Sequence, residues 1–257
     1  MAIISIVNDK GGVGKTVTAV NLAAALALKG QHVLLVDLDP QASATASLGL
    51  NRVRPAVALP EVFTEGHEIL KAVVSSQRKN LEIVPGDTRM KDVNIALASR
   101  IGRERILENR LGSVMSSYDF VLIDCPPSIS LLTLNAIVAS DYVLIPVIPD
   151  FLSVNGLVEL QSVLKEVAQA LRVQPKVLGI LPTIVDYRNA VTAEVLALLR
   201  STYKSLVTKT EIRVNVKLRE APGFGQTIFE YAPQSIGAEN YRALAEEVLQ
   251  RCRRSHG

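Results

Sequence analysis

The hydrophobic pattern of the chain alternates between short apolar runs and longer segments with helical periodicity. Residues 2–7 form a β-branched run that ends at Asn8, which is typical of a buried strand. A glycine-rich loop follows, and residues 16–30 are rich in Ala and Leu up to Gly30, which predicts a helix with a glycine stop. The same criteria predict further strands at 32–39, 81–86, 119–127, 141–149 and 176–185, and further helices at 100–116, 153–172, 190–204 and 237–254.

This alternation of strands and helices predicts an α/β fold with a single doubly wound, mainly parallel sheet and helices on both faces. Residues 1–257 contain no internal repeat, low-complexity linker or break in composition, so we expect one domain. Residues 40–60 have no clear period and are expected to form a functional loop with short helical pieces. Because ligands bind beyond the carboxyl ends of parallel strands, polar side chains at those ends should meet at one edge: Asn8, Asp37, Asp39, Asp124 and Asp150.

Composition and charge change this picture only locally. The chain is 48% hydrophobic and 4% aromatic, so its core is aliphatic, as expected for strands that are covered on both faces. The formal net charge of +3 is too small to indicate a polyanionic partner. Between Asp186 and Arg219, however, seven Lys or Arg face three Asp or Glu. Such an excess fits a protein that binds a phosphate backbone, but solvated helix faces produce the same pattern, so both interpretations stay open.

The cysteine pattern and the apolar runs bear on the compartment. Cys125 and Cys252 lack metal-ligand spacing, and a reducing, cytoplasmic setting is the simplest interpretation. The first residues show no secretion signal, and no apolar run reaches the ~18–20 residues that a spanning helix needs. We therefore expect a cytoplasmic protein without a membrane partner.

The loop at residues 9–16 is the strongest chemical signal in the sequence. Glycines at positions 11, 12 and 14 let backbone N–H groups wrap around a phosphate, in front of a helix N-terminus. Lys15 would reach the β- and γ-phosphates, and the Thr16 hydroxyl would bind Mg²⁺. The usual P-loop pattern is not fully met, because Asp9 stands where its first glycine belongs. An ordinary glycine turn before a helix is the alternative.

Acidic residues at strand ends could complete such a site. The apolar run 120–124 ends in Asp124, which could hold Mg²⁺ through water, or could simply cap a helix. Asp37 and Asp39 are two residues apart at the end of another strand, so both would point to one face if the strand continues. One of them could polarise an attacking water, although a polar turn before Pro40 would look the same.

Several motifs together resemble a known family. They are "KGGVGKT" (10–16), "VLLVDLDPQASAT" (33–45), "FVLIDCPPSISLLTLNA" (120–136), "IPV" (145–147), "VNGLVEL" (154–160) and "LREAPGFGQTI" (218–228). In this order they resemble the ParA/Soj group of DNA-partitioning ATPases, within the wider class that includes MinD. The resemblance covers nearly the whole chain, from residue 3 to about 250, and the combination of motifs is highly specific.

The resemblance implies a deviant Walker A site for ATP and Mg²⁺. Lys10 would reach across a nucleotide-sandwich homodimer to phosphates bound by the other subunit, whereas Lys15 would serve its own nucleotide. Asp39 would position the hydrolytic water, with Asp37 supporting the Mg²⁺ shell and Asp124 as the second acidic motif. The metal set is therefore Thr16, Asp37, Asp39 and Asp124, and the nucleotide set is Lys10, Gly11, Gly12, Val13, Gly14, Lys15, Thr16, Val17 and Asn215, the last bracketing the adenine.

The resemblance also implies partners. The ATP-bound dimer would bind non-specific double-stranded DNA, and a ParB-like protein would stimulate its hydrolysis. The basic residues that match or adjoin DNA-binding positions are Arg188, Arg213, Lys217 and Arg219. Val17 replaces a common threonine, and the segment 212–217 departs from the usual Ile-Pro-Arg-Asn, which affects the adenine and DNA contacts.

The predicted function is an ATP-dependent dimerisation switch that partitions plasmid or chromosome DNA, nucleoid-associated in the cytoplasm. Three alternatives remain open at the level of the sequence. The same ATPase could position a protein cargo on the nucleoid, or act at a membrane surface as MinD does. The chain could also be a metabolic P-loop enzyme, such as an ATP-dependent ligase or a small-molecule kinase.

Overall fold

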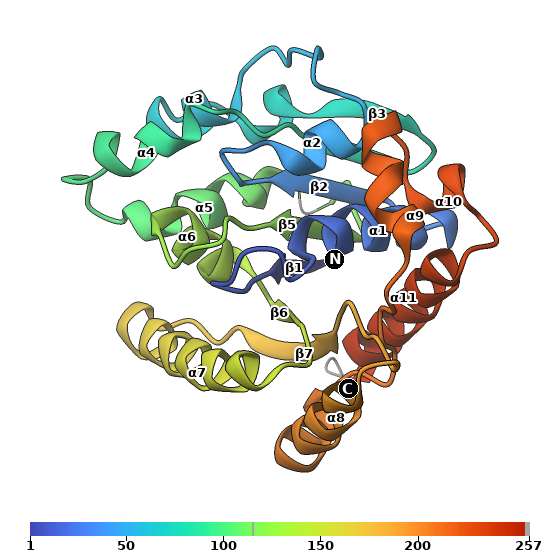
Figure 1. Ribbon diagram of the computed structural model, residues 1–257. Helices are drawn as coiled ribbons and strands as arrows, with labels where there is room; N and C mark the ends of the chain where they lie inside the picture. Colours follow the sequence, from blue (N-terminus) through green and yellow to red (C-terminus); the bar gives the residue numbers. More distant parts are fainter. Residues whose placement is uncertain (115, 255–257) are drawn as a thin grey trace.

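The computed structural model describes residues 1–114 and 116–254, and its centre is one seven-stranded sheet (Figure 1). The strand order is β3-β4-β2-β5-β1-β6-β7, and every pair is parallel except β3 with β4. The strands are β1 (Ala2–Ile6), β2 (Val33–Asp37), β3 (Val74–Arg78), β4 (Leu81–Val84), β5 (Phe120–Asp124), β6 (Tyr142–Val147) and β7 (Lys176–Pro182).

Helices cover both faces of this sheet (Figure 1). They are α1 (Lys15–Leu28), α2 (Ser43–Ser47), α3 (Leu59–Thr64), α4 (Met90–Ala96), α5 (Ile106–Leu111), α6 (Leu131–Ala139), α7 (Phe151–Leu171), α8 (Ala190–Tyr203), α9 (Val216–Glu220), α10 (Ile228–Tyr231) and α11 (Ile236–Arg254). The predicted α/β class, with a mainly parallel, doubly wound sheet, is confirmed.

Alternating side chains of the strands build two separate aliphatic cores. In β1, Ile4 and Ile6 pack with α1 and α11, whereas Ile3 and the following Val7 pack on the face covered by α5, α6 and α7. Successive residues of a strand point to opposite faces, which explains why these runs are apolar at nearly every position. α1 ends before Gly30, whose positive φ of 85° supplies the predicted stop.

The structure contains elements that the sequence did not predict, among them β3, α4, α6, α9 and α10, and it shortens one predicted helix. β3 was not predicted, because its sequence VSSQR is polar; it lies at the antiparallel edge, where only one position is buried. α6 was not predicted as a helix. The helix expected at 100–116 is observed as the shorter α5 with flanking 3₁₀ turns. Gly102, whose φ of 72° does not fit an α-helix, lies just before these turns.

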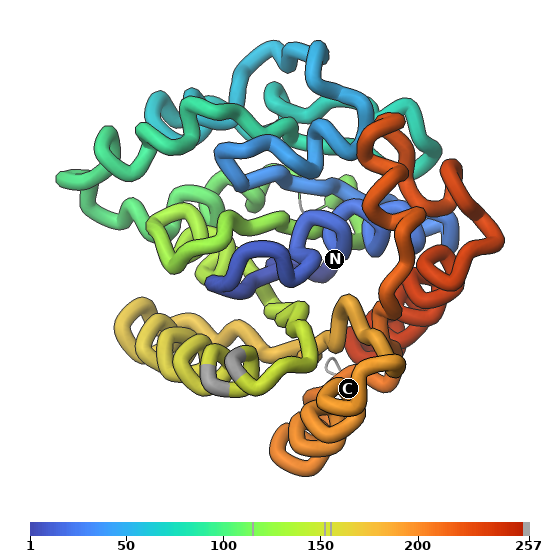
Figure 2. Tube along the Cα trace, in the orientation of Figure 1, coloured from blue at the N-terminus to red at the C-terminus, as the bar shows by residue number. Residues whose placement is uncertain are grey.

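The C-terminal segment packs against the N-terminal half of the chain (Figure 2). The 3₁₀ turn Ala221–Phe224 packs on α2, and a Cβ at Gly225 would lie 2.7 Å from Cα of Gly49. Arg78 of β3 joins both sides, since it donates to the carbonyls of Leu48 (3.2 Å) and Gly225 (2.8 Å). These contacts hold the segment after β2 against the segment that carries α9.

Candidate nucleotide site and basic surface

The phosphate loop is held at the carboxyl edge of the sheet between β1 and α1. Asn8 Nδ2 donates to the carbonyl of Pro146 at 2.7 Å, and Asn8 Oδ1 accepts from the backbone N of Lys10 at 2.9 Å. Asn8 therefore fixes the start of the loop to the neighbouring strand β6. Gly12 and Gly14 have positive φ values of 75° and 87°, which explains why glycine is needed there. A Cβ at Gly12 would meet nothing within 4 Å, so this turn of the loop is open to a ligand.

Lys15, the second lysine of this loop, lies over the main chain of the loop itself. Lys15 Nζ donates to the carbonyl of Lys10 at 2.7 Å, and its side chain is largely buried. Burial lowers the pKa of Lys15, an effect opposed by the negative charge of Asp124. α1 begins at this residue, so the N–H groups of its first turn lie at the loop, where an anion site needs them.

Two carboxylates lie side by side beneath this loop. Asp37 ends β2 and Asp124 ends β5, the two residues pair in register, and both are fully buried. Among the described residues, Asp37 Oδ1 and both oxygens of Asp124 have no hydrogen-bond partner. Burial, with repulsion from Asp39, raises the pKa of Asp37 to about 6, and burial, with repulsion from Asp37, holds the pKa of Asp124 well above its usual range. Unpartnered buried carboxylate oxygens of this kind fit a divalent cation.

The neighbouring residues fit a magnesium–phosphate complex. The Thr16 side chain lies near enough to Asp124 to lower its pKa, although no hydrogen bond of normal geometry joins them. Within residues 1–114 and 116–254, no three His, Cys, Asp or Glu side chains form a metal cage. Mg²⁺ needs no such cage, because it is commonly held by one or two carboxylates, a phosphate and water. Asp39, which is 8% exposed, accepts from the backbone N of Gln41 at 2.9 Å beside them.

A pocket of about 270 Å³ lies between the phosphate loop and residues 212–219. Its wall includes Gly12, Gly14 and Val17 from the loop and α1, and Asn215 from the segment before α9. Asn215 Oδ1 accepts from the backbone N of Lys217 at 2.8 Å and so caps α9. The structure therefore brings Asn215 to the phosphate loop, and its contact with adenine stays a prediction.

Lys10 occupies a different place from Lys15. Its side chain lies against α7, with Cε 3.3 Å from the position that a Cβ on Gly156 would take. The structure does not bring Lys10 onto the Asp37–Asp124 pair, and its reach across a dimer stays a prediction. Asp9, which replaces a P-loop glycine, has one buried oxygen without a partner in the described part of the chain. Asp150 caps α7, because its side chain accepts from the backbone N of Ser153.

The basic residues that were predicted to bind DNA are partly compensated by acids. Arg188 makes two bonds to Asp186, at 2.8 and 2.6 Å, and Lys217 Nζ bonds Glu220 at 2.8 Å. Charge counting along the sequence could not reveal these pairs. The four predicted residues therefore divide into two with an acidic partner and two without.

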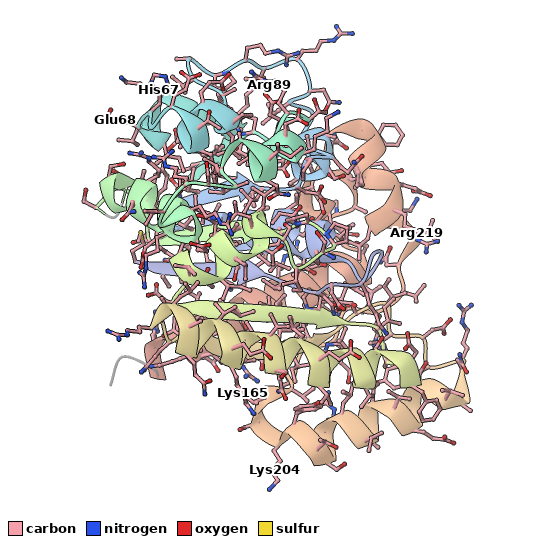
Figure 3. All side chains as sticks on the ribbon, turned by 90° about the vertical axis from the view of Figure 1, so that its left-hand side faces the viewer. His67, Glu68, Arg89, Lys165, Lys204 and Arg219 are labelled. Carbon is pink, nitrogen blue, oxygen red and sulfur yellow. The ribbon has the colours of Figure 1, made fainter. Side chains whose placement is uncertain are left out.

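Arg213 and Arg219 have no carboxylate partner among the residues described. The Arg213 guanidinium lies 5.5 Å from the ring centre of Tyr187, and both arginines line the 270 Å³ pocket. Figure 3 shows Arg219 projecting from the surface, far from Lys204 at the end of α8. Arg213 and Arg219 thus lie together beside the phosphate loop, and Lys204 does not belong to this surface.

Residues that sequence reasoning missed support the acidic pair. Thr45 donates both its backbone N (2.8 Å) and its Oγ1 (2.7 Å) to Asp37 Oδ2. Thr183, the residue after β7, holds the phosphate loop, because its Oγ1 donates to the carbonyl of Val13 at 2.8 Å. Thr45 was visible in the sequence as the last residue of the motif "VLLVDLDPQASAT", but its partner could be identified only in the fold.

Comparisons with known proteins agree with this geometry. A family model described as an AAA domain matches residues 1–177. The chain is 39% identical over 246 residues to the sporulation initiation inhibitor protein Soj of Bacillus subtilis (strain 168), covering 96% of this chain and 97% of Soj. It is 34% identical over 253 residues to the chromosome partitioning protein ParA of Caulobacter vibrioides, with coverage of 98% and 95%.

Solved structures show the same fold. A cobyrinic acid a,c-diamide synthase from Mycobacterium smegmatis, with bound ATP analogue and magnesium, superposes with a TM-score of 0.85 at 31% identity, covering 98% of this chain and 96% of that one. The cell division ATPase MinD of Pyrococcus furiosus gives a TM-score of 0.78 at 27% identity, with coverage of 97% and 98%. These similarities confirm the predicted ATPase activity and its cofactors, ATP and Mg²⁺. With its motifs, its sheet and its phosphate loop in agreement, the chain belongs to the ParA/Soj family of P-loop ATPases.

Proposed function

We propose that the protein is an ATP-dependent dimerisation switch that binds DNA non-specifically and partitions a plasmid or chromosome. The observation that carries the proposal is the pair of buried carboxylates, Asp37 and Asp124, with unpartnered oxygens beneath a glycine loop that holds Lys15. Names of relatives that refer to chromosome partitioning support the biological part. We place the protein in the cytoplasm, associated with the nucleoid. Among the described residues, no helix combines the length and apolarity needed to cross a bilayer.

The chain's own residues divide the chemistry of hydrolysis among them. The loop N–H groups and the N-terminus of α1 bind the phosphates, and the Lys15 ammonium offsets their charge. Asp37, Asp124 and the Thr16 hydroxyl would hold Mg²⁺, which when bound would withdraw charge from the phosphate oxygens. Asp39 orients the attacking water and accepts a hydrogen bond from it.

Dimerisation would depend on nucleotide through Lys10. A second cation beside the triphosphate offsets the charge that two facing sites would accumulate, so the dimer gains charge-assisted contacts only when ATP is bound. Measurement of molecular size in solution with ATP tests this. It compares the Asp39→Ala protein, in which hydrolysis is blocked, with the same protein carrying Lys10→Ala as well. The Lys10→Ala protein should stay monomeric, and a dimer of normal stability would refute the cross-subunit role.

DNA binding would use the surface that includes Arg213 and Arg219, with Arg188 and Lys217 beside it. The test is binding of arbitrary duplex DNA by the Asp39→Ala protein with ATP, at increasing salt. Replacing both Arg213 and Arg219 with Ala should weaken binding and lower the slope of log affinity against log salt, because each lost phosphate contact removes about one released counterion.

A matched control removes a cation from another part of the molecule. Lys165 projects from α7 (Figure 3), and Lys165→Ala should leave both affinity and salt slope unchanged. If the Asp39→Ala protein with ATP binds no duplex DNA at low salt, the DNA part of the proposal is wrong.

The ATPase rate separates the remaining candidates. We expect a slow rate alone, stimulated by DNA together with a ParB-like partner. A rate stimulated by a protein of another cargo would favour positioning of that cargo on the nucleoid. The M. smegmatis neighbour favours a second candidate, an ATP-dependent amidating ligase, which requires turnover that depends on a small substrate and ignores DNA. Co-sedimentation with liposomes would favour a MinD-like function.

A further inference from the structure

Thr45 directs both of its hydrogen-bond donors to the carboxylate of Asp37. It is 4% exposed on α2, eight residues after Asp37. Its backbone N and its Oγ1 donate to the same oxygen, Asp37 Oδ2, at 2.8 and 2.7 Å. The same Oγ1 accepts from the backbone N of Gly86 at 2.8 Å. One buried hydroxyl therefore joins the end of β2, the helix α2 and the segment after β4.

This arrangement decides which oxygen of Asp37 is free. Two donors on Oδ2 leave Oδ1 as the buried oxygen without a partner in the described part of the chain, at the strand end where Asp124 pairs in register. A carboxylate held by two donors on one side cannot rotate without losing both bonds. Hydrogen bonds of this type orient metal-binding carboxylates in other proteins.

Close packing holds the same group from the other side. A Cβ at Gly86 would lie 2.8 Å from Asp37 Cγ, 2.9 Å from its Oδ2 and 2.8 Å from Ala42 Cα. No real Cβ is found so close to main-chain atoms, so only glycine lets the 85–89 segment approach this carboxylate. The carboxyl group is thus confined between Gly86 and the two Thr45 donors.

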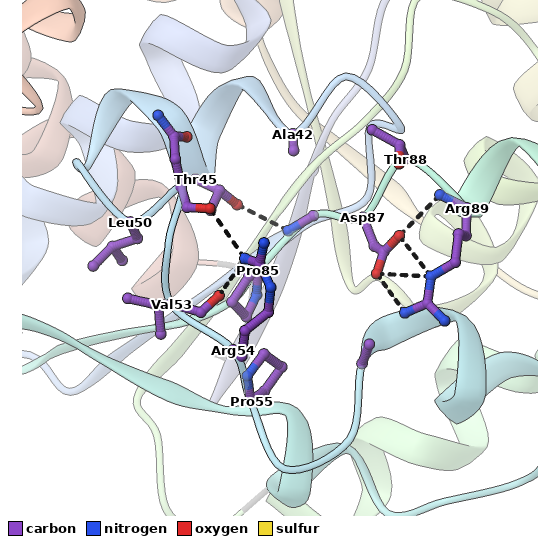
Figure 4. Close-up of a pocket in the computed structure, with 13 residues that line it drawn as sticks. Ala42, Thr45, Leu50, Val53, Arg54, Pro55, Pro85, Asp87, Thr88 and Arg89 are labelled. Carbon is purple, nitrogen blue, oxygen red and sulfur yellow. Dashed lines mark hydrogen bonds and ion pairs between the residues drawn. The ribbon is translucent and has the colours of Figure 1, made fainter.

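The other side of Thr45 and Gly86 forms the wall of a pocket of about 540 Å³ (Figure 4). Arg54 lines this pocket and bonds only to main-chain carbonyls in the described structure, whereas Arg89 is paired with Asp87 and Glu61. The pocket wall is bonded to Asp37 through Thr45, because the Thr45 hydroxyl accepts from the backbone N of Gly86 and donates to Asp37 Oδ2.

We infer that Thr45 is a positioning residue for Mg²⁺ binding: it fixes Asp37 so that Oδ1 faces the cation, and it couples the cation to α2 and the 85–89 segment. The inference rests on the proposed function, because it requires that Asp37 holds the metal. It assigns to Thr45 no contact with the nucleotide or with the cation.

The test measures metal affinity directly. Mn²⁺ serves as a paramagnetic substitute for Mg²⁺, and its binding to the full-length ADP-loaded protein is followed by electron paramagnetic resonance. Thr45→Val keeps the shape and the backbone N–H but removes the hydroxyl, and it should weaken Mn²⁺ binding about tenfold. Thr45→Ser retains the hydroxyl and should restore affinity close to that of the wild type. ADP affinity without metal should be the same in all three proteins.

Controls distinguish positioning from general stability. Thr208 is also buried, and its Oγ1 donates to the carbonyl of Thr210 at 2.6 Å, so Thr208→Val removes a comparable bond outside the site and should leave Mn²⁺ affinity unchanged. If Thr45→Val does not fold, Thr45→Ala provides the same measurement without a bulky methyl group. Wild-type Mn²⁺ affinity in a folded Thr45→Val or Thr45→Ala protein would overturn the inference.

Asp37→Asn separates this inference from the proposed function. If Asp37→Asn weakens Mn²⁺ binding and the Thr45 variants do not, only the positioning role is wrong. If Asp37→Asn also binds Mn²⁺ normally, the metal role of Asp37, and with it this part of the proposed function, fails.

Discussion

Gly225 lies where the segment after α9 contacts the segment after α2. Its replacement by alanine directly tests how much this contact stabilises the fold. Gly225 has a φ of 65°, and an added Cβ would lie 2.7 Å from Cα and 3.1 Å from N of Gly49. Both neighbours are main-chain atoms, so no side chain can rotate away to make room. The contact joins the turn after α9 to the end of α2, which follows Asp37 and Asp39.

The magnitude follows from two additive costs. A left-handed conformation costs an alanine about 1–2 kcal/mol relative to glycine. Overpacking against a rigid neighbour costs about 1–3 kcal/mol more. We therefore expect Gly225→Ala to lower the free energy of unfolding by about 3 kcal/mol. For a domain of this size, that corresponds to a decrease in Tm of roughly 6–12 °C.

The assay is thermal unfolding by circular dichroism without nucleotide, with Gly223→Ala as control. Gly223 is exposed two residues away, and a Cβ there would meet nothing within 4 Å and no positive φ. Its Tm should change by less than about 2 °C. Equal Tm values for the two variants would refute the argument that backbone contact between Gly225 and Gly49 stabilises the fold.

Three further predictions concern charge and packing. The pKa of Asp37 is raised in the folded state to about 6 from its usual 3.8, so the unfolded chain loses this proton first. Stability of the metal-free protein should therefore fall as pH rises from about 4 to 6, and Asp37→Asn should flatten this decline in pH-dependent melting. Asp186→Asn removes the carboxylate that competes with phosphate for Arg188, so DNA affinity should rise about two- to fivefold in salt titrations, a small effect because the pair is exposed to solvent. The exposed acid Glu194, replaced by Gln, should have no such effect. Arg78→Ala removes bonds to three carbonyls and to Glu230, and urea unfolding should show a loss of about 1–3 kcal/mol in the free energy of unfolding. An unchanged midpoint would contradict the conclusion that Arg78 stabilises the contact between the two segments.

Much of the candidate site could be predicted because its residues are close in sequence. The glycine loop, Lys15 and Thr16 are contiguous, and their function depends on backbone geometry that glycine and a helix N-terminus produce locally. The placement of Asp37 and Asp124 followed from the rule that parallel strands end at one edge of the sheet. The fold class followed from the same alternation of strands and helices.

Other features could not be predicted, because they depend on contacts between distant segments. The polar strand β3 exists because β4 offers it an antiparallel edge, and its own sequence carries no apolar pattern. The charge excess in the C-terminal region predicted a basic surface, yet the fold neutralises Lys217 with Glu220 and places Arg213 over Tyr187. Net charge is a sum over residues, whereas binding depends on which charges remain without a partner.

The sequence by itself indicated a nucleotide-phosphate loop and the residues that we propose carry its chemistry, because the required groups follow one another along a single loop and at strand ends. Only the tertiary structure decided how those groups are held: Thr45 and Gly86 confine one oxygen of Asp37 and leave the other free beside Asp124. The physical reason is that the sequence specifies which residue is a carboxylate, whereas its orientation is set by hydrogen-bond donors and packing from a helix and a loop elsewhere in the fold.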